Sequence, residues 1–161
     1  MELPYGIPLP AGYRWQEGKE RDRVRVQEWL QATLQESFPD QQDWRHLEAT
    51  VARLYDPLST PCWWIMLGQL NRIGCLWIGT SLDQITGKSV GYMFMLRVDP
   101  DHRRRGLGRT LLLAGETWAR QKGLSGLCLQ VFASNQTAIG LYTQTGFVTQ
   151  GFWLGKSFAE N

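Results

Sequence analysis

Residues 98–110 read Val-Asp-Pro-Asp-His-Arg-Arg-Arg-Gly-Leu-Gly-Arg-Thr, and the rest of the chain can be ordered around them. The run before them, 90–96, is apolar and typical of a strand. After them, apolar residues recur every three or four positions over 107–119, which predicts an amphipathic helix. The stretch is therefore predicted to be the turn between a strand and a helix.

This turn has the properties of an anion-binding site. Gly106 and Gly108 lack a Cβ atom, so the backbone can approach a bulky anion and adopt positive φ. The first N–H groups of the following helix are unpaired and carry the positive end of its dipole. Arginines add forked donors that match phosphate oxygens. These observations predict an anion site suited to a pyrophosphate. The arginines are Arg103, Arg104, Arg105 and Arg109.

Two common phosphate loops do not fit this stretch. A dinucleotide-binding loop needs a third glycine where the chain has Leu111, and a Walker loop needs Lys-Ser/Thr after its glycines. What remains is Arg103-x-x-Gly106-x-Gly108, preceded by Leu96-x-Val98-x-Pro100. This pattern resembles the acetyl-CoA pyrophosphate loop of the GNAT superfamily of acyl-CoA-dependent N-acyltransferases. An arginine-rich, solvated turn is the alternative interpretation.

A second motif, downstream, supports the same resemblance. The family's second signature is a strand ending in Val, followed by Asn-x-x-Ala-x-x-x-Tyr-x-x-x-Gly-Phe. The spacing between the two motifs leaves room for one helix and one strand, as in that family. The resemblance covers 60–158 well and the first third only by element order. The matching residues are Val131, Asn135, Ala138, Tyr142, Gly146 and Phe147.

The resemblance implies a fold for the whole chain. We expect a single domain over 1–161, with an extended lead at 1–11. Its class is α/β (α+β): a mixed, mostly antiparallel sheet of six or seven strands with helices on both faces. The expected elements are a strand at 13–16, helices at 19–35 and 43–54, strands at 62–70, 72–79 and 89–98, a helix at 107–122, a strand at 126–132, a helix at 135–145 and a final strand or bent pair of strands at 147–158.

The resemblance also implies roles for individual residues. Main chain near the end of the central strand would pair with the acyl carbonyl and the pantetheine arm of acetyl-CoA, and the loop would hold its pyrophosphate. Asn135 would bond the arm, unless it is only a helix N-cap. Tyr142 would protonate the departing thiolate, unless it only packs on the sheet. The implied cofactor-binding residues are Leu96, Arg97, Val98, Arg103, Arg104, Arg105, Gly106, Leu107, Gly108, Arg109, Asn135 and Ala138.

The sequence leaves the general base and the acceptor amine open. Many relatives place a carboxylate on the central strands, but 62–79 and 89–98 contain none. Asp83, Tyr92 and a water relay remain candidates. Aromatic residues on these strands either line an acceptor groove or belong to the core, and alternation allows only about half of them to face a groove. They are Trp63, Trp64, Trp77, Tyr92 and Phe94.

Composition and charge fit an ordinary globular protein of 161 residues, 43% hydrophobic and 20% charged. The net charge is +2 and the basic surplus lies in one loop, which argues against nucleic-acid binding. The three cysteines have no metal-like spacing, so we expect buried free thiols and no metal. Neither a signal peptide nor a membrane-spanning run is expected, which favours the cytoplasm.

These observations predict an N-acetyltransferase that moves an acetyl group from acetyl-CoA directly to a primary amine in a ternary complex. No cysteine lies at either motif's catalytic position, which argues against a covalent intermediate. The alternative is a non-catalytic acyl-CoA-binding or regulatory module that retains the loop. Many relatives form dimers through the last strand, and the apolar character of 147–158 would allow a homodimer here.

Overall fold

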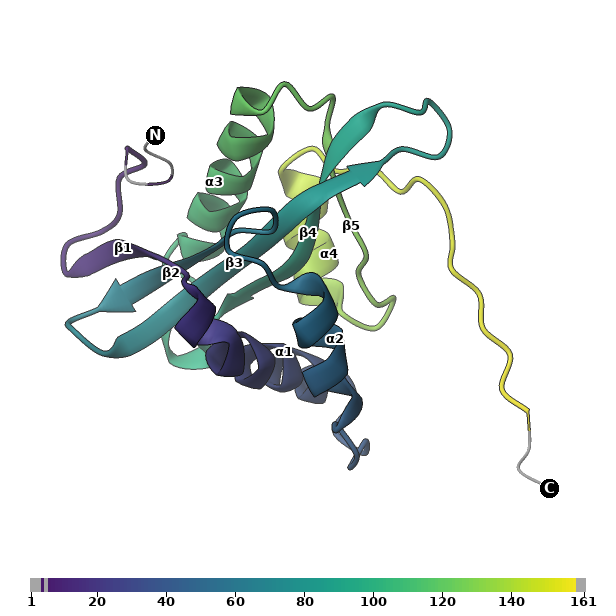
Figure 1. The fold of residues 1–161 in the computed structure, drawn as a ribbon, viewed down its shortest axis with the longest axis horizontal. Coiled ribbons are helices and arrows are strands. Elements are labelled where there is room, and N and C mark those ends of the chain that lie inside the picture. Colours follow the sequence, from purple (N-terminus) through teal and green to yellow (C-terminus); the bar gives the residue numbers. More distant parts are fainter. Residues whose placement is uncertain (1–3, 5, 159–161) are drawn as a thin grey trace.

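The computed structural model describes residue 4 and residues 6–158. Its centre is a five-stranded mixed sheet in the order β1-β2-β3-β4-β5 (Figure 1). Neighbours pair antiparallel from β1 to β4, whereas β4 and β5 are parallel. The strands are β1 (Tyr13–Glu17), β2 (Cys62–Leu67), β3 (Asn71–Leu82), β4 (Ser89–Val98) and β5 (Leu127–Leu129).

Helices cover both faces of the sheet, as expected (Figure 1). On one face, α3 (Leu107–Gln121) buries its apolar stripe against β3 and β4. On the other face, α1 (Arg23–Ser37) and α2 (His46–Leu54) contribute Val26 and Val51 to a second core. A fourth helix, α4 (Gln136–Gln144), follows β5. Short 3-10 turns, η1 (Glu20–Asp22) and η2 (Pro100–His102), precede α1 and follow β4.

An irregularity in β4 changes which way its side chains face. Trp77 pairs with Met95 and the next residue, Ile78, pairs with Met93, so Phe94 is an extra residue on β4. Met93 therefore packs in the core under α3, while Phe94 and Met95 both face the core under α1 and α2. Such a bulge shifts the side-chain alternation of the strand by one residue.

The strand count of six or seven was wrong, because the described chain forms five strands. The predicted strand at 126–132 is reduced to β5, and the predicted strand at 147–158 is not formed. A strand needs a partner for its N–H and C=O groups, and the chain after α4 runs away from the sheet (Figure 1). Its large apolar side chains are exposed: Val148, Phe152, Trp153, Leu154 and Phe158.

Most of the aromatic residues of the central strands belong to the two cores, on both faces of the sheet. Trp63, Trp64 and Trp77 are buried in the core, so they do not line a groove. Tyr92 and Phe94 are half-buried and contact each other, with ring centroids 5.2 Å apart. Cys62, Cys75 and Cys128 are free thiols; Cys62 and Cys75 are buried as expected, whereas Cys128 is only partly buried. In the described part of the chain, no helix is both long and apolar enough to cross a membrane.

Candidate functional site

The site is built where β4 ends and α3 begins. The Asp99 carboxylate accepts a hydrogen bond from the N–H of Asp101 and fixes the start of η2. The chain then passes through two left-handed residues, Arg104 with φ 62° and Gly106 with φ 79°. Arg104 is the non-glycine residue with positive φ in the described chain, a conformation that costs energy for an L-residue. Strain of this kind concentrates at functional sites.

The two loop glycines serve different purposes. Gly106 is the N-cap of α3, and a Cβ atom added there would meet nothing within 4 Å. Its positive φ is the reason for a glycine at this position, and no side chain fills the space where its Cβ would lie. At Gly108 an added Cβ would lie 3.2 Å from Leu141 Cδ2, so this glycine allows α4 to pack against α3. The arrangement suits a bulky anion at the helix N-terminus.

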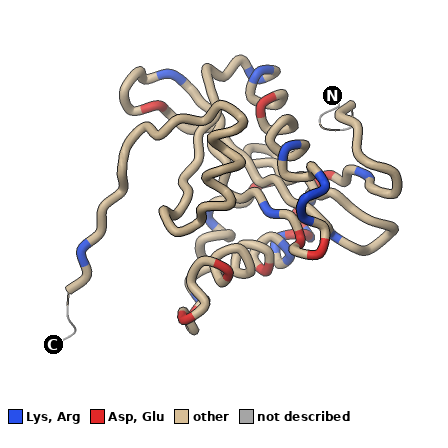
Figure 2. Tube along the Cα trace, turned by 180° about the vertical axis from the view of Figure 1, so that it is seen from behind, with Lys and Arg blue, Asp and Glu red and all other residues tan. Residues whose placement is uncertain are grey.

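Three of the loop arginines are held by residues from other elements. Arg103 donates from Nη2 to both carboxylate oxygens of Glu36 on α1, at 2.9 and 3.0 Å, and from Nε to the Val98 carbonyl at 3.0 Å. Arg105 Nη1 donates to the Tyr13 hydroxyl at 3.1 Å. Arg109 Nη2 donates to Gln144 Oε1 of α4 at 2.6 Å. We call residues 103–109 the arginine loop, and the consecutive arginines at its start form a blue run in Figure 2.

Glu36 joins the loop to the sheet. Its carboxylate also accepts from Arg97 Nη1 on β4 at 2.7 Å, and the Arg97 guanidinium lies over the Trp29 ring. Partial burial opposes ionisation of Glu36, but Arg103 and Arg97 together hold the pKa of this carboxyl below its usual range. The cluster carries two positive charges against one negative charge, so it is cationic.

The end of β4 lies open on the β5 side. Parallel pairing joins Gly91, Tyr92 and Met93 to β5 and stops there, although β4 continues to Val98. Leu96 and Val98 direct their side chains into the core under α3, and Arg97 faces α1. The predicted residues Leu96, Arg97 and Val98 thus form a strand end that β5 does not pair, immediately before the arginine loop.

The second predicted group lies on α4, beside the loop. Asn135 is the N-cap of α4 and its side chain accepts from the Ala138 N–H at 3.2 Å, so the capping interpretation is correct in geometry. Tyr142 is partly buried against the α3 core, with its ring centroid 5.5 Å from that of Phe147. Burial raises the pKa of the Tyr142 phenol above its usual value near 10, so the hydroxyl is a weaker acid than that of an exposed tyrosine.

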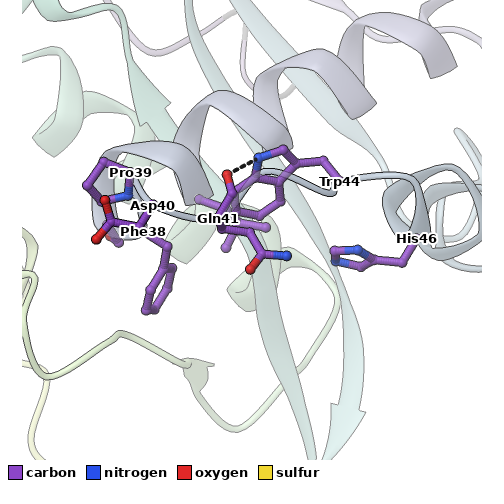
Figure 3. A pocket seen from close by; sticks show the side chains of 8 residues that line it. Phe38, Pro39, Asp40, Gln41, Trp44 and His46 are labelled. Atoms are coloured by element: carbon purple, nitrogen blue, oxygen red, sulfur yellow. Dashed lines mark hydrogen bonds between the residues drawn. The ribbon is translucent and has the colours of Figure 1, made fainter.

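A hollow of about 590 Å³ lies between the end of α1 and the start of α2 (Figure 3). Phe38, at its edge, packs edge-to-face on Phe132, with ring centroids 4.6 Å apart. Phe132 follows β5, so the hollow adjoins the side of the sheet where β4 and β5 separate. It is lined by Leu34, Ser37, Phe38, Pro39, Asp40, Gln41, Trp44 and His46.

The candidates for the general base are less distinctive. The Asp83 carboxylate accepts from the N–H groups of Ile85 and Thr86 in the β3–β4 turn, and these bonds lower its pKa. Burial, with a smaller effect from Cys128, raises the pKa of the Tyr92 phenol. The described residues bring together no group of three side chains that could hold a metal ion.

Sequence reasoning missed the residues that hold the arginines. Tyr13, Glu36 and Gln144 match neither motif, and each reaches the loop from a distant element. No signal local to these positions identifies them, since an isolated Glu or Tyr on a half-exposed surface has no distinctive pattern.

A model of the acetyltransferase (GNAT) family matches residues 23–147, and the chain belongs to this family. It is 31% identical to a mycothiol acetyltransferase of Thermobispora bispora over 159 residues, which cover 91% of the chain and 52% of that protein. It is 38% identical to the uncharacterized N-acetyltransferase YycN of Bacillus subtilis over 93 residues, which cover 56% of the chain and 58% of that protein. The chain thus spans about half the length of these relatives.

Solved structures agree on the fold. A putative acetyl transferase from Pyrococcus furiosus superposes with a TM-score of 0.72 at 20% identity, over 91% of this chain and 99% of that one. A ribosomal-protein-alanine N-acetyltransferase from Brucella melitensis biovar Abortus gives a TM-score of 0.67 at 17% identity, over the same shares. At these identities the likeness establishes the GNAT fold alone.

Proposed function

We propose that this chain is an N-acetyltransferase that moves an acetyl group from acetyl-CoA directly to a primary amine. The observation that carries the proposal is the end of β4, which loses its β5 partner after Met93 and leads into the glycine–arginine loop. A strand end without a partner offers backbone groups to an extended arm, as in β-augmentation. The loop beyond it offers the N-terminus of α3 and forked arginine donors to a diphosphate.

The residues present fit acetyl-CoA, which supplies the acyl thioester. Main chain at Leu96, Arg97 and Val98 would align the acyl and pantetheine portion. Residues 104–109 would hold the diphosphate, with Arg103 contributing its backbone because Glu36 and Val98 occupy its side chain. Asn135 and Ala138, at the start of α4, would flank the pantetheine arm. The chain would act in a single step, without a metal.

The reaction requires one bond to form and one to break. The amine nitrogen attacks the thioester carbonyl carbon, and the carbon–sulfur bond then breaks. Tyr142 would donate its proton to the departing sulfur, a role open to a phenol, which is protonated at neutral pH. The amine proton would leave to Asp83, Tyr92 or water, and the lowered pKa of Asp83 makes that carboxylate a weaker base than an ordinary aspartate.

The hollow between α1 and α2 is where we place entry of the amine. Phe38 and Trp44 give it an aromatic wall, while Asp40 and His46 supply polar groups. The acceptor itself is unspecified. The names of the relatives make amines related to mycothiol the first to screen.

We also propose that the chain forms a homodimer in the cytoplasm. Free thiols fit a reducing compartment. In an extended segment, Val148, Phe152, Leu154 and Phe158 lie on one face, and all four are exposed. A second copy would bury them. Light scattering should give a dimer that truncation after Phe147 converts to a monomer, whereas a monomeric full-length chain would refute this part.

Calorimetric titration with acetyl-CoA tests the proposal, with Arg105→Ala/Arg109→Ala as the comparison. We expect binding that this double variant loses, followed by amine-dependent release of CoA thiol. No binding by folded protein free of co-purified CoA would refute the proposal. The alternative is a non-catalytic acyl-CoA-binding module, supported by the lack of carboxylates on β2 and β4. Binding without thiol release, with or without any amine, would favour it.

A further inference from the structure

The first strand contacts the arginine loop through one hydroxyl group. Tyr13 begins β1 and pairs with Leu67 of β2, at the edge of the sheet. Its hydroxyl lies 2.8 Å from His102 Nδ1 of η2, and its ring meets the His102 ring edge-on at 5.8 Å. The same oxygen accepts a hydrogen bond from Arg105 Nη1 at 3.1 Å. Tyr13 therefore contacts the loop on both sides of Arg104.

The Tyr13 hydroxyl group makes both of these hydrogen bonds. Arg105 can only donate, so the phenol oxygen accepts there and its own proton is available for His102. Toward Nδ1 of His102 the hydroxyl can donate to the unprotonated nitrogen or use its second lone pair to accept from Nδ1–H, and both tautomers satisfy the 2.8 Å contact. The arrangement joins Arg105, Tyr13 and His102 through one oxygen atom. It requires a phenol, since phenylalanine would keep the ring contact and lose both hydrogen bonds.

We infer that Tyr13 is a positioning residue for the anion site: it orients Arg105 toward the diphosphate of a bound CoA ligand. The bond to Tyr13 uses one of the five N–H donors of the guanidinium, so donors remain for phosphate oxygens. Arg105 is otherwise an exposed, flexible side chain, and fixing it before binding reduces the entropy lost on binding. Arg103 differs, because its donors are directed to Glu36 and Val98. This inference rests on the proposed function.

The test is calorimetric titration with CoA of four proteins: wild type, Tyr13→Phe, Arg105→Ala and the double variant Tyr13→Phe/Arg105→Ala. We expect Tyr13→Phe to weaken binding about threefold to tenfold, the range for losing one ordinary hydrogen bond, because the loss reaches the ligand only through the orientation of Arg105. In the double variant the Tyr13 change should add no further loss, because its effect passes through Arg105. Dephospho-CoA, which lacks the 3′-phosphate and keeps the diphosphate, should show the same ratio between wild type and Tyr13→Phe.

Tyr55→Phe is the matched control. Tyr55 also uses its hydroxyl, donating to the Lys19 carbonyl at 2.9 Å, but on the face covered by α1 and α2. It should change CoA affinity less than twofold even where it lowers the melting temperature. If wild type binds CoA and Tyr13→Phe binds equally well, or the two changes add independently, the inference fails while the proposed function stands. The inference also fails if wild type and Tyr13→Phe bind dephospho-CoA with equal affinity while they differ in affinity for CoA. If wild type does not bind CoA, the proposed function fails as well.

Discussion

Replacement of Gly106 by alanine would isolate the energetic role of the loop backbone. Gly106 has φ 79° and ψ 3°, and an added Cβ would meet nothing within 4 Å. The substitution therefore introduces no clash, and its cost is the left-handed conformation of an L-residue. That cost is about 1–2 kcal/mol, which corresponds to roughly a 5- to 30-fold change in an equilibrium constant.

The strain energy can lower either the free energy of unfolding or the affinity for acetyl-CoA. Two assays distinguish these outcomes. If the Gly106→Ala variant keeps the loop conformation, the free energy of unfolding falls by about 1–2 kcal/mol and acetyl-CoA affinity is unchanged. If the free loop relaxes instead, stability is retained and the dissociation constant rises roughly 5- to 30-fold, because binding must restore the strained turn. The loss in unfolding free energy from urea titration and the loss in binding free energy from calorimetry should together amount to about 1–2 kcal/mol.

Gly108→Ala is the control for this substitution. Gly108 lies in the first turn of α3 with ordinary φ, so alanine gains up to about 1 kcal/mol of helix propensity. That gain opposes the contact with Leu141 at 3.2 Å, and we expect a small net effect on unfolding. Gly106→Ala with wild-type stability and wild-type affinity would refute the argument, as would a combined loss well above the strain energy.

Three other changes test separate parts of the molecule. Tyr142→Phe keeps the packing on Phe147 and removes only the hydroxyl, so kcat should fall at least about tenfold in a thiol-release assay with acetyl-CoA affinity unchanged. Asp22→Asn breaks the buried pair with Arg72, where the side chains are 5% and 21% exposed and 2.7 Å apart; urea unfolding should show a loss of about 3–5 kcal/mol, and a loss below 1 kcal/mol would contradict it. The pKa of Glu36 is lowered on folding, so its pairs stabilise the protein above the unfolded pKa near 4.5 and less as the pH falls through the folded pKa. Unfolding at several pH values should therefore show the gap between wild type and Glu36→Gln closing on acidification, and a constant gap would refute the assignment.

Local patterns predicted most of the elements. The strand expected at 89–98 is β4 with the same bounds, because its apolar run lies between a polar turn and Asp99-Pro100. The helix expected at 107–122 is α3, which ends one residue earlier, before Gly123. The final strand could not be predicted in this way. Alternation at 147–158 favours an extended segment, but a strand also needs a partner edge, and β5 offers only three residues.

The same distinction, between local patterns and long-range packing, applies to the candidate site. Motif spacing predicted the turn between β4 and α3 and the placement of Tyr142 on α4, and the capping preference of Asn predicted the cap at Asn135. The contacts that hold the arginines join residues 67, 92 and 35 positions apart, and such pairs depend on how the sheet and helices pack.

Gly79 in β3 also has a role that only the packing reveals. An added Cβ would lie 2.8 Å from the Phe94 ring, so this glycine makes room for the bulge residue of β4. The sequence alone shows only a glycine in a strand.

The contacts of Arg103 show how the two sides of the site are joined. Arg103 is the first residue of the loop motif, yet its guanidinium is bound to Glu36, in the last turn of α1. One residue further, Ser37 and Phe38 line the hollow between α1 and α2. A displacement of that last turn must therefore move the carboxylate that holds Arg103, or break both hydrogen bonds to it. The hollow and the arginine loop are thus connected through the Glu36 side chain, which neither sequence motif contains.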